Sequence, residues 1–133
     1  MQNKRLSMYG VREVMSFAAL LIVLSLLFHV NSVMAHATLV KSEPPRRAAL
    51  SAPPKQIQLW FNEKIEGSYA SVIVEDSNKN LITENIPELV ANDPKSVVLI
   101  LPRIDPGRYT VQYRVMSVDG HVIESKYDFS VKE

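Results

Sequence analysis

The chain has 133 residues, no cysteine and a formal net charge of +1. This length allows one small domain and an N-terminal targeting segment. Without cysteine neither disulfides nor thiolate ligands are available, so a bound metal needs nitrogen and oxygen donors. Residues 36–133 carry 12 Lys and Arg against 13 Asp and Glu. This balance excludes the basic surface that is typical of nucleic-acid-binding proteins.

The first 35 residues have the three parts of a secretory signal peptide. The basic residues Lys4, Arg5 and Arg12 precede an apolar core at 14–30. Val33 and Ala35 then occupy the two positions that signal peptidase inspects, where small or aliphatic residues are required. We therefore expect a signal peptide at 1–35 and a single domain at 36–133. An uncleaved anchor is the alternative, because the apolar core lies at the short end of the roughly 17 to 25 residues that can span a bilayer.

From Thr38 onward, short runs with period-two apolar alternation are separated by Pro, Gly, Asn and Asp, and no window has a helical period. The expected strands lie, in chain order, within 38–45, 56–62, 69–76, 81–89, 96–101, 107–117 and 122–131. Pro87 suggests that the fourth is an edge strand or the end of one. The apolar run 96–101 is expected to be central, and alternation predicts an inward face of Ile57, Leu59 and Phe61 in the second strand.

About seven short strands separated by regular turns are typical of an all-β, immunoglobulin-like Greek-key β-sandwich. Tyr109 follows the turn Asp105-Pro106-Gly107 at the start of a late strand. A tyrosine at such a place predicts a tyrosine corner, in which the hydroxyl bonds to upstream backbone, with simple core packing as the alternative. Trp60 faces away from the alternating core residues and is expected to pack on the sheet.

Residues 36–133 contain two histidines, His36 and His121. Cleavage after Ala35 would make His36 the first residue, whose α-amine and Nδ1 can chelate one ion. His121 would add a third nitrogen, and nitrogen with carboxylate donors in a tetragonal arrangement suits Cu(II). However, Ala35-His36-Ala37 also has an A-x-A pattern, and cleavage before Thr38 would remove this ligand.

Asp119 lies two residues before His121, so in an extended segment the two side chains point to one side. Asp119 could bind the ion or orient His121. Asp119-Gly120 between apolar runs is also a strong hairpin-turn signal, and that reading stays open. Glu63 continues the inward face of the preceding strand at its rim, where its carboxylate needs a partner. That partner could be Lys64, or a histidine or amine that binds the metal.

Other chemistry has little support. The chain has no phosphate-binding glycine loop, no G-x-S-x-G and no H-E-x-x-H. Asp119 and His121 could in principle form a relay with Ser117 or Ser125, but the sequence shows neither a nucleophile elbow nor an oxyanion hole. We therefore expect a protein that is not an enzyme.

Three stretches taken together resemble the bacterial copper-resistance protein C (CopC) family: "HATLVKSEPP" from His36, "LWFNEKI" from Leu59, and "PGRYTVQYRVMSVDGHVIESKYDFSV" from Pro106. The resemblance covers nearly all of 36–133 and implies a small exported copper-binding sandwich. It implies a Cu(II) site formed by His36, through amine and imidazole, with Asp119 and His121. Glu63 matches a family carboxylate and would be a hydrogen-bonding or pH-responsive partner of the ligands.

Two departures from the family pattern affect what is expected. Family members with a second, Cu(I) site use a methionine-rich segment, and Met116 is the only methionine in 36–133, so that site is not supported. Val122 and Ser125 stand where the family often has Pro and Gly, which would alter the loop without removing a ligand.

The sequence thus predicts an exported protein, in the periplasm or at the outer face of the cell envelope, that holds one Cu(II) ion as carrier or buffer. A separate membrane copper-transport protein is the partner that the resemblance implies. The first alternative is an immunoglobulin-like interaction module that binds no metal, and the second is an oxidative copper enzyme with the same N-terminal chelate.

Overall fold

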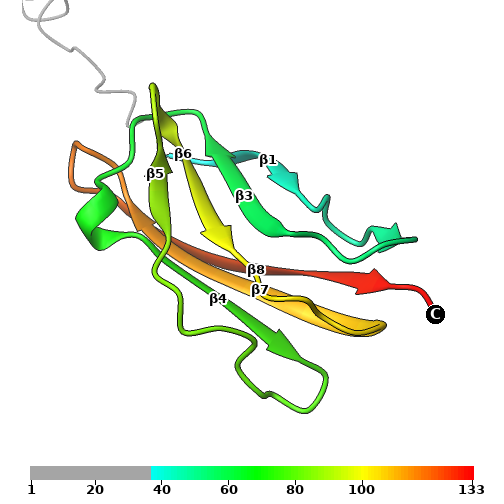
Figure 1. The fold of residues 1–133 in the computed structure, drawn as a ribbon. Coiled ribbons are helices and arrows are strands. Elements are labelled where there is room, and N and C mark those ends of the chain that lie inside the picture. Colours follow the sequence, from blue (N-terminus) through cyan, green and yellow to red (C-terminus); the bar gives the residue numbers. More distant parts are fainter. Residues whose placement is uncertain (1–36) are drawn as a thin grey trace, which may run out of the picture. The chain divides into compact units, whose positions relative to one another are not determined.

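The structure, a computed structural model, describes residues 37–133, which form two four-stranded sheets (Figure 1). The first sheet has the order β1-β3-β6-β5: Leu39–Glu43, Gln56–Phe61, Asp93–Ile100 and Glu88–Val90. The second has the order β2-β8-β7-β4: Ala49–Leu50, Val122–Val131, Gly107–Met116 and Ser71–Asp76. A short 3-10 helix, η1 (Gly67–Tyr69), precedes β4. The predicted all-β sandwich is confirmed.

Alternating burial along the strands creates the core between the sheets. In β3, Ile57, Leu59 and Phe61 are buried and the intervening residues are half-buried. The long hairpin of β7 and β8 contributes the same pattern from the other sheet, so apolar side chains from both sheets form one cluster. Removing these side chains from water is the main favourable contribution to folding, since the chain has no disulfide.

Tyr109 makes the tyrosine corner that the sequence predicts. Its hydroxyl donates a hydrogen bond of 2.7 Å to the backbone oxygen of Asp105. Its ring is buried and stacks on Phe129 with centroids 5.4 Å apart. The hydrogen bond and the core packing therefore both occur, and together they fix the start of β7.

The prediction of a strand within 81–89 is wrong for most of this range. Only Glu88–Val90 forms a strand, beginning directly after Pro87. Leu81 makes an isolated bridge to Glu75, and the intervening residues run outside any strand. Pro87 has no N–H to donate, so the ladder can begin only after it. The expected edge position is confirmed, because β5 is the last strand of its sheet.

Trp60 packs on the outer face of the first sheet, as expected. It is half-buried, and the Nζ of Lys41 lies 4.4 Å from the centre of its ring. Among the described residues, no helix has the length and apolar character needed to cross a membrane.

Candidate metal centre

The loop between β7 and β8 carries two of the predicted ligands. Its backbone is closed by hydrogen bonds from Ser117 N to His121 O, 2.9 Å, and from Gly120 N to Ser117 O, 2.8 Å. Gly120 has φ 92°, a left-handed conformation that glycine adopts without steric conflict. The predicted turn at Asp119-Gly120 is therefore confirmed, and the turn also positions both candidate ligands.

Asp119 and His121 lie in direct contact. Oδ2 of Asp119 is 2.8 Å from Nδ1 of His121. The other oxygen, Oδ1, accepts hydrogen bonds from the hydroxyl of Ser117 and, at 3.3 Å, from the backbone N–H of His121. Ser117 is completely buried, so its hydroxyl holds the carboxylate from the core side of the loop. The carboxylate and the imidazole are thus held in a defined mutual position.

The contacts of Asp119 also determine its charge. The hydroxyl of Ser117, followed by His121, lowers the pKa of Asp119 to about 2. Hydrogen bonds donated to a carboxylate favour its ionised form. Asp119 therefore carries a negative charge throughout the mildly acid and neutral range, as a metal ligand or a partner of an imidazolium requires.

A second segment, which follows β3, lies directly beside this loop. Ile65 forms an isolated bridge with Ser117, and Val118 N donates to Lys64 O at 3.1 Å. Glu63, one residue before Lys64, is half-buried at the end of the sandwich, as the alternation predicts. Glu63 makes no ion pair with Lys64 within the described chain. Lys64, the simpler of the two partners expected for Glu63, is therefore not observed as its ion-pair partner.

The start of the described chain is attached to the same segment. Thr38 N donates to Oδ1 of Asn62 at 2.6 Å, and Asn62 N donates to Thr38 O at 3.1 Å. Lys95 Nζ bonds the backbone oxygen of Asn62 at 2.9 Å, and Ala37 is buried. Three segments far apart in sequence thus converge at one end of the sandwich: Ala37–Thr38, Asn62–Ile65 and Ser117–His121.

The described residues include Asp119, His121 and Glu63, whereas His36 lies just outside them. Within 37–133, no three His, Asp or Glu side chains come close enough to share one ion. The structure therefore brings together the pair Asp119 and His121. It does not test the complete predicted set, which includes His36.

The three polar side chains of the loop do not have the arrangement of a hydrolytic relay. In such a relay the serine hydroxyl bonds the histidine, which the aspartate orients from its other side. Here the hydroxyl of Ser117 bonds Asp119, and Ser117 has no exposed surface. A nucleophile must reach its substrate, so the geometry does not support Ser117 in that role.

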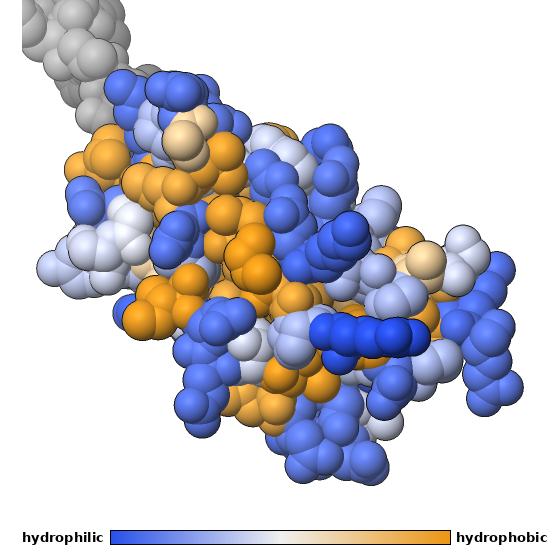
Figure 2. Space-filling model, viewed as in Figure 1, coloured by the Kyte–Doolittle hydropathy of each residue, from blue (hydrophilic) through white to orange (hydrophobic). Residues whose placement is uncertain are grey.

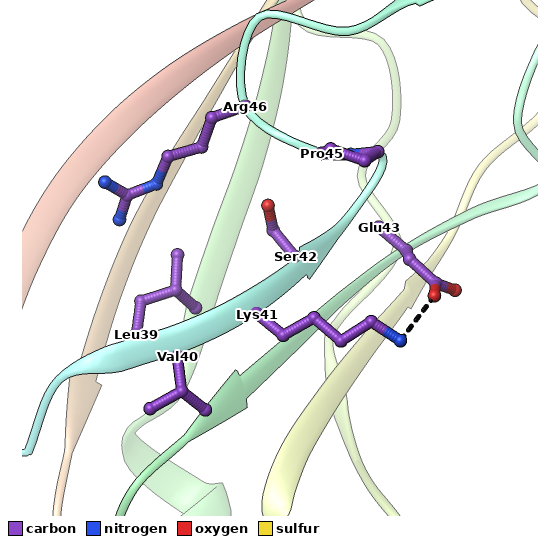
Figure 3. Close-up of a pocket in the computed structure, with 7 residues that line it drawn as sticks. All are labelled: Leu39, Val40, Lys41, Ser42, Glu43, Pro45 and Arg46. Carbon is purple, nitrogen blue, oxygen red and sulfur yellow. Dashed lines mark ion pairs between the residues drawn. The ribbon is translucent and has the colours of Figure 1, made fainter.

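A surface hollow along β1 lies apart from this loop. Figure 3 shows it lined by residues 39–43, 45 and 46, with Lys41 and Glu43 paired on one side of the strand. The ion pair joins Nζ of Lys41 and Oε1 of Glu43 at 2.7 Å. The side chains of Ser42 and Arg46 lie on the other side. None of its lining residues belongs to the β7–β8 loop. We assign it no part in the candidate metal centre.

Sequence reasoning missed the roles of two residues. From the sequence alone Ser117 is considered only as a possible nucleophile, whereas it directly follows β7 with the same parity as the buried residues of that strand and orients Asp119. Asn62 gave no signal, because its hydrogen bonds to Thr38 join residues 24 positions apart. Both residues position other groups and donate or accept hydrogen bonds at the end of the sandwich.

The chain was compared with known proteins. Residues 39–132 match the family model described as the CopC domain. The chain is 41% identical over 106 residues to protein YobA of Escherichia coli K12, covering 76% of this chain and 82% of that protein. The fold is similar to the crystal structure of CopC from Methylosinus trichosporium OB3b, with TM-score 0.69 and 35% identity over 73% of this chain and 94% of that one.

A second solved structure has the same fold: PcoC, a methionine-rich copper resistance protein from Escherichia coli. The likeness has TM-score 0.65 and 30% identity, and covers 74% of this chain and all of that one. The resemblance first suggested by three short motifs thus extends over the whole described sandwich. This chain belongs to the CopC family.

Proposed function

We propose that this protein, exported and cleaved after Ala35, binds one Cu(II) ion at the end of the sandwich and serves as a copper carrier or buffer rather than as a catalyst. Membership of the CopC family, which includes a copper resistance protein, connects the chain to copper. The contact between Asp119 and His121 is the observation that carries the more specific proposal, with His36, Asp119 and His121 as the ligands.

The spacing of this pair suits two neighbouring donors on one ion. Bonds of about 2.0 Å that meet at a right angle separate their donor atoms by about 2.8 Å. Oδ2 of Asp119 and Nδ1 of His121 are 2.8 Å apart. At this contact the two atoms are directed at each other, so the geometry as it stands supports Asp119 as the residue that orients His121, with the lone pair of Nε2 available to the ion. Asp119 would become a ligand itself once its carboxylate turned toward that ion.

The remaining donors would come from His36. Thr38 is bonded twice to Asn62, whose chain segment contacts the β7–β8 loop. Two residues of extended chain span about 7 Å, so in a chain that begins at His36 the amine and imidazole would be within reach of this end of the sandwich. Glu63 is the carboxylate next to Asn62, and we propose that it accepts a hydrogen bond from the amine or imidazole of His36.

The chemistry of this donor set suits reversible carriage. Nitrogen and oxygen donors hold Cu(II) more firmly than Cu(I), since the softer Cu(I) prefers sulfur. Reduction of the ion would therefore favour release. A separate membrane copper-transport protein in the cell envelope is the proposed recipient or donor of the ion.

The first test combines the intact mass of the exported protein with a Cu(II) titration. A mass that starts at His36 and a stoichiometry of one ion per chain are expected. A mass that starts at Thr38, or a protein that starts at His36 and binds no Cu(II), would contradict the proposal. The second outcome would favour an interaction module.

A further inference from the structure

One side of the sandwich, bounded by the edge strands β4 and β5, exposes several large apolar side chains. Tyr69, Leu81, Ile86 and Leu89 have exposed fractions of 58%, 51%, 82% and 37%. All four lie in η1, in the β4–β5 connection or in β5. Figure 2 looks onto β5 and this connection and shows apolar residues gathered across the middle of the view. We call these four residues the β4–β5 surface.

Hydrogen bonds and packing attach this surface to the fold. Leu89 packs against η1 so closely that a Cβ added at Gly67 would lie 2.9 Å from its Cδ1. Leu81 bridges to Glu75, and Ile82 N donates to Val74 O at 2.9 Å. Beside Ile86, the amide of Asn85 donates to Ile100 O at 2.9 Å. The exposed apolar groups therefore belong to segments with defined places on the sandwich.

Carboxylates surround these apolar groups. The segment 66–89 contains five acidic residues and a single basic one, Lys79, whose Nζ lies 3.6 Å from Glu75. Its formal charge is therefore −4, whereas 36–133 as a whole has −1. The acidic residues are Glu66, Glu75, Asp76, Glu84 and Glu88. The segment that carries the exposed apolar surface is thus more negative than the domain as a whole.

The sheets also end on this side. β4 is the last strand of one sheet and β5 the last strand of the other. The 81–82 segment occupies the edge of β4 only near Val74 and Glu75. Within 37–133, no other strand pairs with the edge at Ser71–Ile73 or with the outer edge of β5. Free strand edges present backbone donors and acceptors that another extended segment can pair with.

We propose that the β4–β5 surface binds a partner protein through a segment that carries Lys or Arg beside apolar residues. Apolar groups of the partner would cover the exposed side chains, and its cations would pair with the surrounding carboxylates. A second copy of the same surface would bring −4 against −4, and an anionic lipid surface would also be repelled. Charge complementarity therefore favours a basic protein segment.

This surface begins next to the candidate metal loop. Glu66 N donates to Met116 O at 2.8 Å, and Ile65 bridges to Ser117. A partner docked on β5 and η1 would lie beside the segment that carries Asp119 and His121. The idea that such a partner exchanges copper with this protein rests on the proposed function. The docking of the partner does not depend on that function.

The test is photo-crosslinking in the native host. The full chain would carry p-benzoylphenylalanine in place of Ile86 or, as the control, in place of Thr110 on the outer face of the other sheet. We expect one envelope protein to be captured from position 86 and not from position 110. The captured protein would be identified by mass spectrometry, purified and titrated with the exported domain.

Charge reversal then tests the chemistry. Affinity for the purified partner should fall at least about tenfold in the Glu84→Lys/Glu88→Lys variant and with added salt. It should change little in Glu43→Lys/Glu133→Lys, which alters the net charge equally at other places. The proposal would be overturned if no adduct formed, or if the adduct contained lipid, a second copy of this chain or residues 1–35. It would also be overturned if both double variants changed the affinity equally. Cu(II) titration of the same variants separates this result from a failure of the copper proposal.

Discussion

Oδ2 of Asp119 lies 2.8 Å from Nδ1 of His121, and Oδ1 of the same carboxylate accepts a hydrogen bond from the buried Ser117. The carboxylate is thus fixed on one side and directed at an imidazole on the other. An oriented pair with little freedom loses little entropy when an ion binds. Several expected outcomes depend on this relationship.

Asp119→Asn removes the charge while keeping a side chain of similar size. We expect Cu(II) affinity to fall by about 10- to 100-fold, because the anionic oxygen donor and the partner of His121 are both weakened. Asp128→Asn is a matched control, since Asp128 accepts a hydroxyl hydrogen bond of 2.8 Å from Thr110 in a comparable way. Competition titrations with a chelator would measure the Cu(II) affinity of both variants. If the two variants bound Cu(II) equally well, Asp119 would be excluded from the site.

Ser117→Ala tests the cause of the low pKa of Asp119. The hydroxyl of Ser117 is the largest cause of its shift to about 2, so in the variant the pKa should rise toward the ordinary aspartate value of 3.8. Any stabilisation from this group is present above about pH 4 and is lost as the pH falls toward 2. Carboxyl 13C chemical shifts followed through an acid titration measure the change. An unchanged pKa in the variant would show that other contacts hold the carboxylate ionised.

Copper affinity should decrease as the pH falls from about 8 to 6. The amine and the two imidazoles bind the ion only in their unprotonated forms, so protons compete with Cu(II) for these nitrogens. Asp119 does not contribute to this dependence, because its pKa of about 2 keeps it ionised. Chelator competition at a series of pH values measures the effect, and a flat profile would contradict the three-nitrogen ligand set.

Tyr109 and Tyr127 form a natural comparison in the core. The hydroxyl of Tyr109 donates to Asp105, whereas the hydroxyl of Tyr127 has no hydrogen-bond partner among the described residues. Tyr109→Phe should lower the free energy of unfolding by about 1 kcal/mol. Tyr127→Phe should leave it unchanged or raise it. Urea unfolding measures both, and a larger loss for Tyr127→Phe would contradict the assigned partners.

Tyr127 should also make the fold sensitive to alkali. Burial raises its pKa to about 12, and the nearby Ser42 hydroxyl, which lies outside hydrogen-bond geometry, offsets only part of this rise. Because the unfolded side chain ionises near 10, stability is retained below pH 10 and decreases between about 10 and 12. Unfolding measured across this range should show a smaller decrease in Tyr127→Phe than in the parent protein.

The sequence allowed much of the fold to be predicted, for a physical reason. Strict alternation in β3 leaves only one way to bury Ile57, Leu59 and Phe61, and a turn before Tyr109 leaves one place for its hydroxyl. The 81–89 segment lacked such a constraint. Its apolar residues are interrupted by polar ones and by Pro87, so most of it lies outside the sheets.

The candidate site was predictable where it depends on local spacing. Asp119 and His121 are two residues apart in one hairpin, so their contact follows from the chain itself. The bond between Asn62 and Thr38 follows instead from the pairing of β1 with β3, which spacing along the chain does not reveal. The half-buried position of Glu63 at the end of the sandwich could be predicted from alternation. The lack of an ion pair between Glu63 and Lys64 could not.

The most direct measurement is the Cu(II) affinity of the chain beginning at His36 against the same chain with one glycine added before it. The added residue converts the amine of His36 into an amide and removes the chelate. We predict an affinity at least about 100-fold weaker, with altered electron paramagnetic resonance parameters, while a glycine added after Glu133 has no effect. Equal Cu(II) affinity with and without the N-terminal glycine would contradict the account.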